Sequence, residues 1–162
     1  MAKPKERLDN VTQAEAFLNT AQQYHLAATT LLPLHQQVES PLYFLYTHAL
    51  ELALKAYLRS HGLPTPLGQP GHALQALFEQ CQRKGLQVHS DLRGVIDLLE
   101  SENKLHGFRY FVFKATGRPE INYCRKVVDE LMGVVAEEVK KRPTKGLSSA
   151  VMKFTIGKPE KK

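Results

Sequence analysis

Hydrophobic residues recur along this chain with the 3.6-residue period of amphipathic α-helices. Five segments show the period, at about residues 11–32, 40–62, 72–84, 90–104 and 119–142. No strand-like alternation of polar and apolar residues precedes the C-terminal tail. The pattern therefore predicts an all-α fold: an antiparallel up-and-down bundle of four to five helices, with the two shorter helices filling one side.

Residues that begin helices precede the first two segments. Asn10 or Thr12 can cap the first helix, with Glu15 as the capping-box partner of Thr12. Ser40 is the expected N-cap of the second helix, and Pro41 takes its first helical position. Glycines stand where the second and third helices should end, at Gly62 and Gly85.

The second helix is the most informative segment, because its apolar arc covers about 200° of the circumference. Such an arc is too wide for a helix at the edge of a bundle, so the helix should pack between two neighbours, or between one neighbour and a second subunit. The remaining arc carries polar residues at spacings of 3, 4 and 4, namely His48, Glu51, Lys55 and Arg59.

The 162 residues are enough for one domain, expected at 8–141, and the net charge of +6 is unevenly spread. From Lys140 to the end there are eight basic residues and one acidic residue, a local charge of +7. Residues 142–162 are expected to form a basic tail, partly disordered or with one short extended segment. Such a tail can attract phosphate backbones or acidic partners, or it can simply be solvated.

Several classes of protein are excluded by what the sequence lacks. There is no apolar leader and no run of about 18 apolar residues, so we expect a cytoplasmic protein without a membrane span. The two cysteines, Cys81 and Cys124, fall within helical patterns and are expected to be small buried hydrophobes. Neither a phosphate-binding glycine loop nor a metal-ligand spacing is present, so no cofactor and no metal is expected.

An arginine stands within an aromatic stretch between the fourth and fifth helices. In "LHGFRYFVFKATGRPE", residues 105–120, Arg109 is flanked by Phe108 and Tyr110, with Phe111 and Phe113 following. A cation among rings needs a carboxylate, an anionic ligand or a route to water. The phenylalanines are expected to close the end of the bundle, whereas Tyr110 or Phe108 could stack on a base.

Three stretches resemble HEPN domains, the nucleotide-binding helical bundles of higher eukaryotes and prokaryotes. "YTHALELALKAYLRSHG" resembles the second-helix signature, "GHALQAL" the following helix, and "GFRY" the arginine-containing segment before the last long helix. The resemblance covers about residues 10–141. It implies a homodimer in which two polar clefts meet. It also implies roles such as RNA-cutting toxins, partners of nucleotidyltransferases, or components of phage defence.

The chain departs from the catalytic members of that family. Those members carry an arginine followed by four to six residues and then a histidine, but no histidine follows Arg109, and the last one in the chain is His106. Arg83 and His89 satisfy the spacing, yet they lie between the third and fourth helices. The sequence therefore favours a protein that binds nucleotide, RNA or a partner protein without cutting RNA.

The resemblance leads to one site hypothesis and two alternatives. In the hypothesis, Arg109 points into a cleft bordered by the polar residues of the second helix, with Glu51 as its partner until a phosphate competes for Arg109, Lys55 and Arg59. In one alternative the protein is a metal-independent endoribonuclease in which His48 or His106 replaces the missing histidine. In the other it is purely a protein-interaction module, in which the apolar surface of the bundle and the basic tail dock another protein. Separately from these alternatives, Glu51 and Lys55 can be read as an i,i+4 pair on a solvated face.

His25 falls on the apolar stripe of the first helix. We expect it to be a core or boundary histidine that is bonded to a carbonyl, not a ligand to a metal or a substrate.

Overall fold

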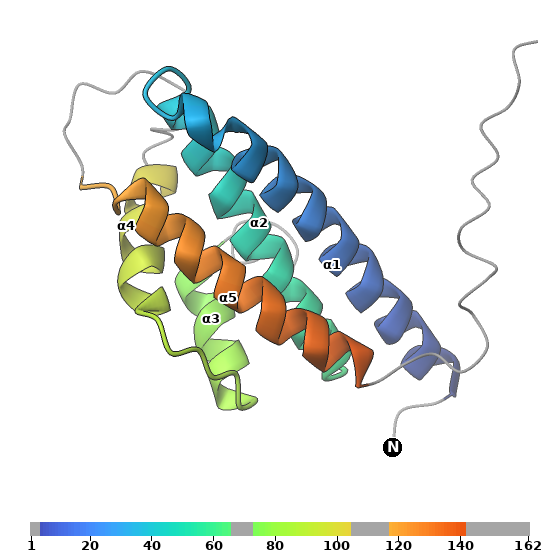
Figure 1. The fold of residues 1–162 in the computed structure, drawn as a ribbon. Helices are drawn as coiled ribbons and strands as arrows, with labels where there is room; N and C mark the ends of the chain where they lie inside the picture. Colours follow the sequence, from blue (N-terminus) through green and yellow to red (C-terminus); the bar gives the residue numbers. More distant parts are fainter. Residues whose placement is uncertain (1–3, 66–72, 105–116, 142–162) are drawn as a thin grey trace, which may run out of the picture.

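The chain folds into helices throughout the part that the structure describes. The computed structural model describes the backbone of residues 4–65, 73–104 and 117–141, and the side chains of 13–65, 73–101 and 117–141. The elements are α1 (Pro4–Leu31), the short 3-10 helix η1 (Leu32–Leu34), α2 (Glu39–Ser60), α3 (Leu74–Arg83), α4 (Leu92–Lys104) and α5 (Ile121–Lys140) (Figure 1). These ranges contain no strand, so the all-α prediction is confirmed.

Among the described helices, α1 and α2 form the most extensive contact. Three fully buried alanines, Ala14, Ala21 and Ala28, follow one another at intervals of seven residues on α1. Residues seven apart lie on the same side of a helix, so α1 presents a stripe of small side chains to the interior. Small side chains allow two helix axes to approach closely, which favours the extensive contact of α1 with α2.

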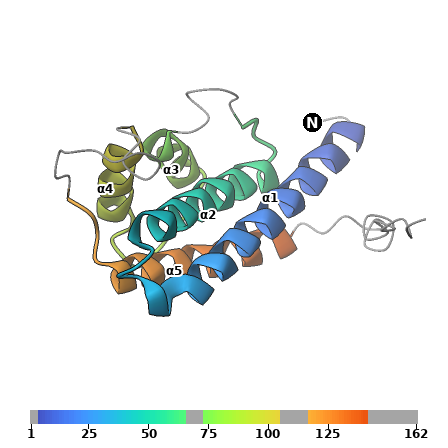
Figure 2. The same ribbon diagram turned by 90° about the horizontal axis from the view of Figure 1, so that it is seen from above.

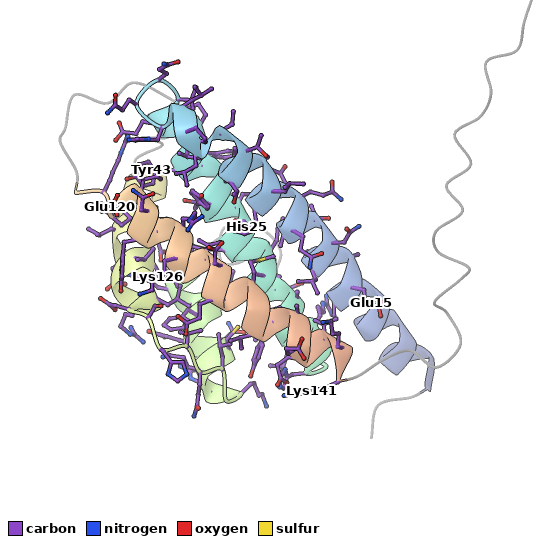
Figure 3. The ribbon with its side chains drawn as sticks, viewed as in Figure 1. Glu15, His25, Tyr43, Glu120, Lys126 and Lys141 are labelled. Carbon is purple, nitrogen blue, oxygen red and sulfur yellow. The ribbon has the colours of Figure 1, made fainter. Side chains whose placement is uncertain are left out.

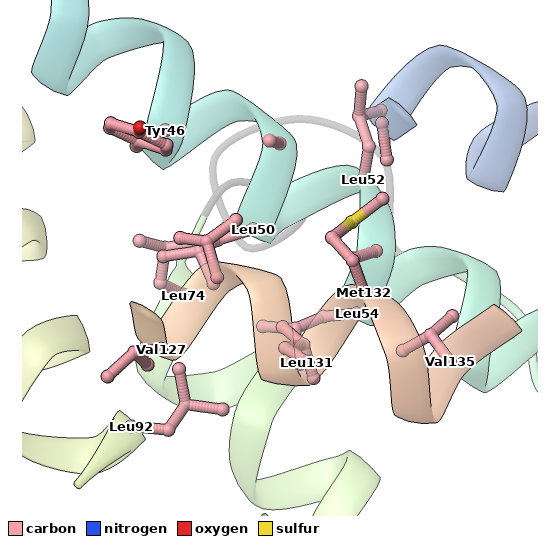
Figure 4. Packing of buried hydrophobic residues seen from close by; sticks show 14 of the residues in the cluster. Tyr46, Leu50, Leu52, Leu54, Leu74, Leu92, Val127, Leu131, Met132 and Val135 are labelled. Carbon is pink, nitrogen blue, oxygen red and sulfur yellow. The ribbon is translucent and has the colours of Figure 1, made fainter. Parts of the chain in front are cut away.

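Helix α2 lies at the centre of the fold. Every residue from Ala49 to Leu58 is buried, and α2 packs against α1, α5 and α3. Figure 4 shows its leucines interleaved with side chains of α5 and α3. The predicted position of α2 between at least two neighbours is therefore confirmed, and α3 and α4 lie on the side away from α1, as expected (Figure 1).

The strict up-and-down order is wrong, because the neighbours α2 and α5 run in the same direction. At their first turns, Arg118 Nη1 lies 3.1 Å from Glu39 Oε2, just before α5 begins. At their last turns, His61 Nε2 lies 3.9 Å from Glu138 Oε2. The chain returns through α3 and α4 between the two helices, so α5 starts at the end where α2 starts (Figure 2).

Two predicted helix starts are also wrong. Helix α1 begins at Pro4, so Asn10, Thr12 and Glu15 fall inside the helix and not at its start. Helix α2 begins at Glu39 with Val38 as its N-cap and no side-chain cap. The Ser40 hydroxyl is instead placed 3.5 Å from Arg118 Nη2, from which it accepts a hydrogen bond.

Other helix ends carry the residues that typically stop or start a helix. Gly62 and Gly85 have φ angles of 73° and 92°, a left-handed conformation that glycine adopts without strain, directly after α2 and α3. Glu120 caps α5 by accepting hydrogen bonds from Asn122 N at 3.0 Å and Tyr123 N at 2.8 Å. No described helix is both long enough and apolar enough to cross a membrane.

Candidate functional site

A pair of opposite charges is buried in the middle of α2. Lys55 Nζ donates to Glu51 Oε1 at 2.6 Å, and the two residues are only 8% and 5% exposed. The i,i+4 pair predicted from the sequence is therefore formed, but it is not solvated. The Thr47 hydroxyl, one turn before Glu51, is also buried and makes no hydrogen bond within the part of the chain that the structure describes.

His48 lies at one end of this buried pair and is held by two aromatic rings. Its imidazole contacts the Tyr24 ring of α1 edge-on, with centroids 4.4 Å apart, and stacks with the Phe44 ring at 5.9 Å. His48 Nδ1 is 3.9 Å from Glu51 Oε2, so the carboxylate lies between the imidazole and the Lys55 ammonium. The rings restrict the imidazole, which remains partly exposed.

Arg59 continues the same line of residues at the last turn of α2, where its side chain is partly buried. It follows Lys55 by four residues, or about 6 Å along the helix axis. We call His48, Glu51, Lys55 and Arg59 the α2 polar cluster. The cluster brings one imidazole, one carboxylate and two permanent cations to one side of the central helix, a set that can hold an anionic group.

The buried pair is not explained by stability alone. Removing two ions from water costs several kcal/mol for each ion, and replacing a buried pair by apolar residues is often neutral or stabilising. Glu51 and Lys55 stand in the buried run Ala49–Leu58, whose other members are mostly leucines and alanines. A charged pair at this position therefore suggests a role in binding.

The aromatic stretch with Arg109 and Tyr110, and His106 before it, lies outside the described residues. Only the end of this connector is described, and it is fixed to the start of α2. Arg118 lies over the Tyr43 ring at 5.5 Å, and the Tyr43 hydroxyl donates to the Pro119 carbonyl (Figure 3). Burial raises the pKa of Tyr43 to about 12, so this hydroxyl keeps its proton for the bond.

A second polar contact, not predicted, joins α1 to α5. His25 Nε2 lies 2.6 Å from Asp129 Oδ1, and Arg125 Nε is 3.8 Å from the other oxygen of the same carboxylate (Figure 3). The expectation that His25 bonds a carbonyl is therefore wrong. Nothing in the sequence signals the pairing, because the two residues are 104 positions apart.

The chemistry available near His25 is limited. A histidine held by a carboxylate can exchange a proton. The ring of Tyr46 lies 6.3 Å away between centroids, and burial raises the pKa of Tyr46 to about 12. A phenol held neutral in this way is a poor nucleophile, so we interpret His25 and Asp129 as a structural tie between two helices.

Ser60, His61 and Glu138 resemble a hydrolytic triad but are not arranged as one. The Ser60 Oγ lies 3.2 Å from His61 Nδ1, and His61 Nε2 is 3.9 Å from Glu138 Oε2. However, Ser60 is buried and its hydroxyl donates to the Tyr57 carbonyl at 2.7 Å. The serine proton is therefore used within the helix, and the three residues join the ends of α2 and α5.

The Arg83–His89 spacing does not form a nuclease pair. Arg83 is exposed on the last turn of α3, 4.0 Å from Glu79 of the same helix. The backbone N–H of His89 donates to Glu130, which also accepts from the Ser90 hydroxyl. These bonds, that of Ser90 foremost, lower the pKa of Glu130, and they fix the turn before α4 to α5.

Neither cysteine is placed for chemistry. Cys81 and Cys124 are both buried, and burial raises the pKa of each thiol. A thiol in such surroundings is unreactive, in agreement with the prediction that both are small core residues. Within the described residues, no three His, Cys, Asp or Glu side chains come together as a metal site would require.

Comparison with known proteins identifies no relative. No protein-family model, no curated protein and no solved structure matches the chain.

Proposed function

We propose that this chain is a HEPN-like bundle that binds the phosphate group of a nucleotide or an RNA, without cutting it, at the α2 polar cluster. The observation that supports the proposal is the buried Glu51–Lys55 pair at the centre of α2. In this proposal, Glu51 holds the Lys55 ammonium in position while the site is empty. A phosphate then binds Lys55 and Arg59, since ammonium and guanidinium groups both bind phosphate oxygens, while Lys55 keeps Glu51 as a partner through another of its three N–H donors.

The same proposal assigns Arg109 and Tyr110 to the ligand. Arg109 precedes Arg118 by nine residues, which extended chain can span over about 30 Å, and Arg118 is fixed at the first turn of α2. Glu51 lies twelve residues after Glu39, or about 18 Å along the helix. The connector is thus long enough for Arg109 to reach the cluster, where Tyr110 would stack on a base.

The resemblance extends the proposal to the setting of the protein. It favours a cytoplasmic homodimer of a prokaryote that acts in a toxin–antitoxin, nucleotidyltransferase-paired or phage-defence system. A ribonuclease remains the second candidate, because His48 is held by Tyr24, Phe44 and Glu51 in the manner of an oriented base. A pure interaction module that uses its basic tail is the third.

Binding of labelled single-stranded RNA and of a labelled adenine nucleotide, followed by fluorescence anisotropy at several salt concentrations, separates these candidates. We expect affinity to fall steeply with salt, and to fall at least about tenfold in Arg109→Ala and in Arg59→Gln. Arg83→Gln, which removes an exposed arginine from α3, is the matched control and should bind like the wild type.

The other outcomes point to the alternatives. Cleavage of RNA in the presence of EDTA, lost in Arg109→Ala and His48→Ala, would establish the ribonuclease. If the Arg109 and Arg59 substitutions leave the affinity unchanged, but truncation of the chain at Thr144 removes binding, then the tail binds the ligand. The proposed site would then be wrong.

A further inference from the structure

From Ala16 to its end, the outer surface of α1 carries no Asp, Glu, Lys or Arg, although the protein is rich in charged residues and the exposed Glu15 stands directly before this stretch. Residues 16–38 contain no Asp, Glu, Lys or Arg, whereas these four make up 23% of the whole chain. About five would be expected in 23 positions at that frequency. The exposed residues of α1 and η1 in this stretch, which we call the α1 face, are Ala16, Asn19, Gln22, Gln23, Leu26, Ala27, Thr30, Pro33 and Leu34.

Two leucines project from this face. Leu26 is 66% exposed and Leu34 is 46% exposed, the two highest values among the large hydrophobic residues that the structure describes. The exposed positions of other helices differ. Those of α5 include Arg125, Lys126 and Glu137. A helix side that faces water normally carries charge, whereas the buried centre of a protein interface is depleted of it.

We propose that the α1 face is the surface through which two copies of this chain associate, with α1 packed against α1 about a twofold axis. In such an interface each residue faces the same surface on its partner. A charged group near the axis would meet its own copy, and the net charge of +6 already opposes association. The α1 face adds no like-charge contact to that repulsion.

The polar residues of the α1 face are also suited to contact the same residues of a second copy. Asn19, Gln22 and Gln23 carry side-chain amides, which both donate and accept hydrogen bonds. An amide can therefore pair with the same amide of a second copy, which a carboxylate or an ammonium group cannot do. Leu26 and Ala27 beside them supply apolar contact. Together these features fit a second copy better than a charged partner.

The size of the face sets the expected strength. Ala16 to Leu34 spans 19 residues, or about 28 Å at 1.5 Å per residue, and a strip about 10–12 Å wide gives roughly 300 Å² on each protomer. Stable complexes bury about 800 Å² on each partner. The dimer should therefore be weak and reversible, with a Kd in the micromolar range. This proposal gives the expected homodimer a specific surface and does not rest on phosphate binding.

Sedimentation equilibrium of the full chain from about 1 to 500 µM tests the proposal. The average mass of the wild type should rise from 18.3 kDa toward twice that value. Leu26→Lys should weaken association by about 100-fold, since like charges then meet at the interface. Leu98→Lys is the matched control, because it adds the same charge at a leucine of α4 that is 38% exposed. It should associate like the wild type.

Two variants that carry opposite charges at the same position give a positive test. Gln23→Glu and Gln23→Lys should each sediment as monomers, and an equimolar mixture should recover the dimer. Circular dichroism confirms that each variant remains folded, as expected for exposed positions. A wild type that stays monomeric up to about 500 µM, a dimer equally affected by Leu26→Lys and Leu98→Lys, or a mixture that does not associate would each overturn the proposal.

Discussion

Lys55→Met measures whether the charged pair on α2 behaves as a buried one. Methionine keeps the length and apolar surface of the lysine stem but removes the ammonium that Glu51 contacts at 2.6 Å. At an effective dielectric constant of about 20, two unit charges at this distance attract by about 6 kcal/mol. The cost of removing both ions from water offsets most of this attraction, so the pair contributes little net stability.

Removing one partner has a much larger effect than the pair itself contributes. Glu51 is 5% exposed, so its carboxylate would remain buried without its ammonium partner. Removing one partner of a buried pair typically costs 3–5 kcal/mol, and His48 Nδ1 at 3.9 Å from Glu51 replaces little of the lost contact, so we expect Lys55→Met to lower the free energy of unfolding by about 3 kcal/mol. For a chain of this size, that loss lowers Tm by roughly 6–12 °C.

The double variant Glu51→Leu/Lys55→Met completes the test. It replaces the whole pair by apolar residues, and its stability should lie within about 1 kcal/mol of the wild type or above it. Lys140→Met is the matched control, since it breaks the exposed contact between Lys140 Nζ and Glu137 Oε1 at 3.0 Å and should cost less than about 1 kcal/mol. Urea unfolding followed by far-UV circular dichroism gives all four values.

Equal effects of the two single substitutions would refute this reasoning. If Lys55→Met and Lys140→Met lower the free energy of unfolding by the same amount, within about 0.5 kcal/mol, the Glu51–Lys55 pair is solvated in solution. The pair would then give no support to a binding role for this part of α2.

Three further predictions concern the core, the thiols and one carboxylate. Ala21→Leu should destabilise the α1–α2 contact by about 1–3 kcal/mol, whereas Ala76→Leu, on the exposed side of α3, should change stability by less than about 0.5 kcal/mol in urea unfolding. Cys81 and Cys124 should react with a thiol reagent only after unfolding, as read by mass spectrometry. The lowered pKa of Glu130 means that its stabilising effect is present above the ordinary glutamate pKa of about 4.3 and is lost as the pH falls through the lower folded-state value. The stability difference between wild type and Glu130→Gln should therefore shrink in acid.

Much of the fold follows from the sequence because helical periodicity and glycine punctuation are local signals. The five helices, the ends at Gly62 and Gly85, and the central position of α2 could all be read from such patterns. The start of α1 could not, because residues 4–10 carry few apolar side chains and lie outside the stripe that defines the rest of the helix. The relative direction of α2 and α5 could not be predicted either, since the lengths of the connections do not specify that these two helices run in parallel.

The candidate site was only partly predictable for a related reason. A period of 3.6 residues assigns side chains to faces of one helix, but it does not say what covers each face. His48, Glu51 and Lys55 could be placed on one line along α2, whereas their burial depends on the packing around α2. The His25–Asp129 contact depends on the register of α1 against α5, which leaves no local trace in either segment.

The buried charged pair of α2 and the uncharged α1 face reverse the usual arrangement of polar and apolar residues on neighbouring helices. Helix α2 buries a charged pair at positions where leucine would fit, whereas α1 exposes Leu26 and η1 exposes Leu34 at positions where a charged residue would fit. Stability and solubility alone favour neither choice, so each is best explained by something that binds there. If the two sites are independent, Glu51→Leu/Lys55→Met should remove phosphate binding without changing the dimer, and Leu26→Lys should do the reverse. If each change instead impairs both properties, ligand and second copy share one site at the interface, and the separation proposed here between the α2 polar cluster and the α1 face is wrong.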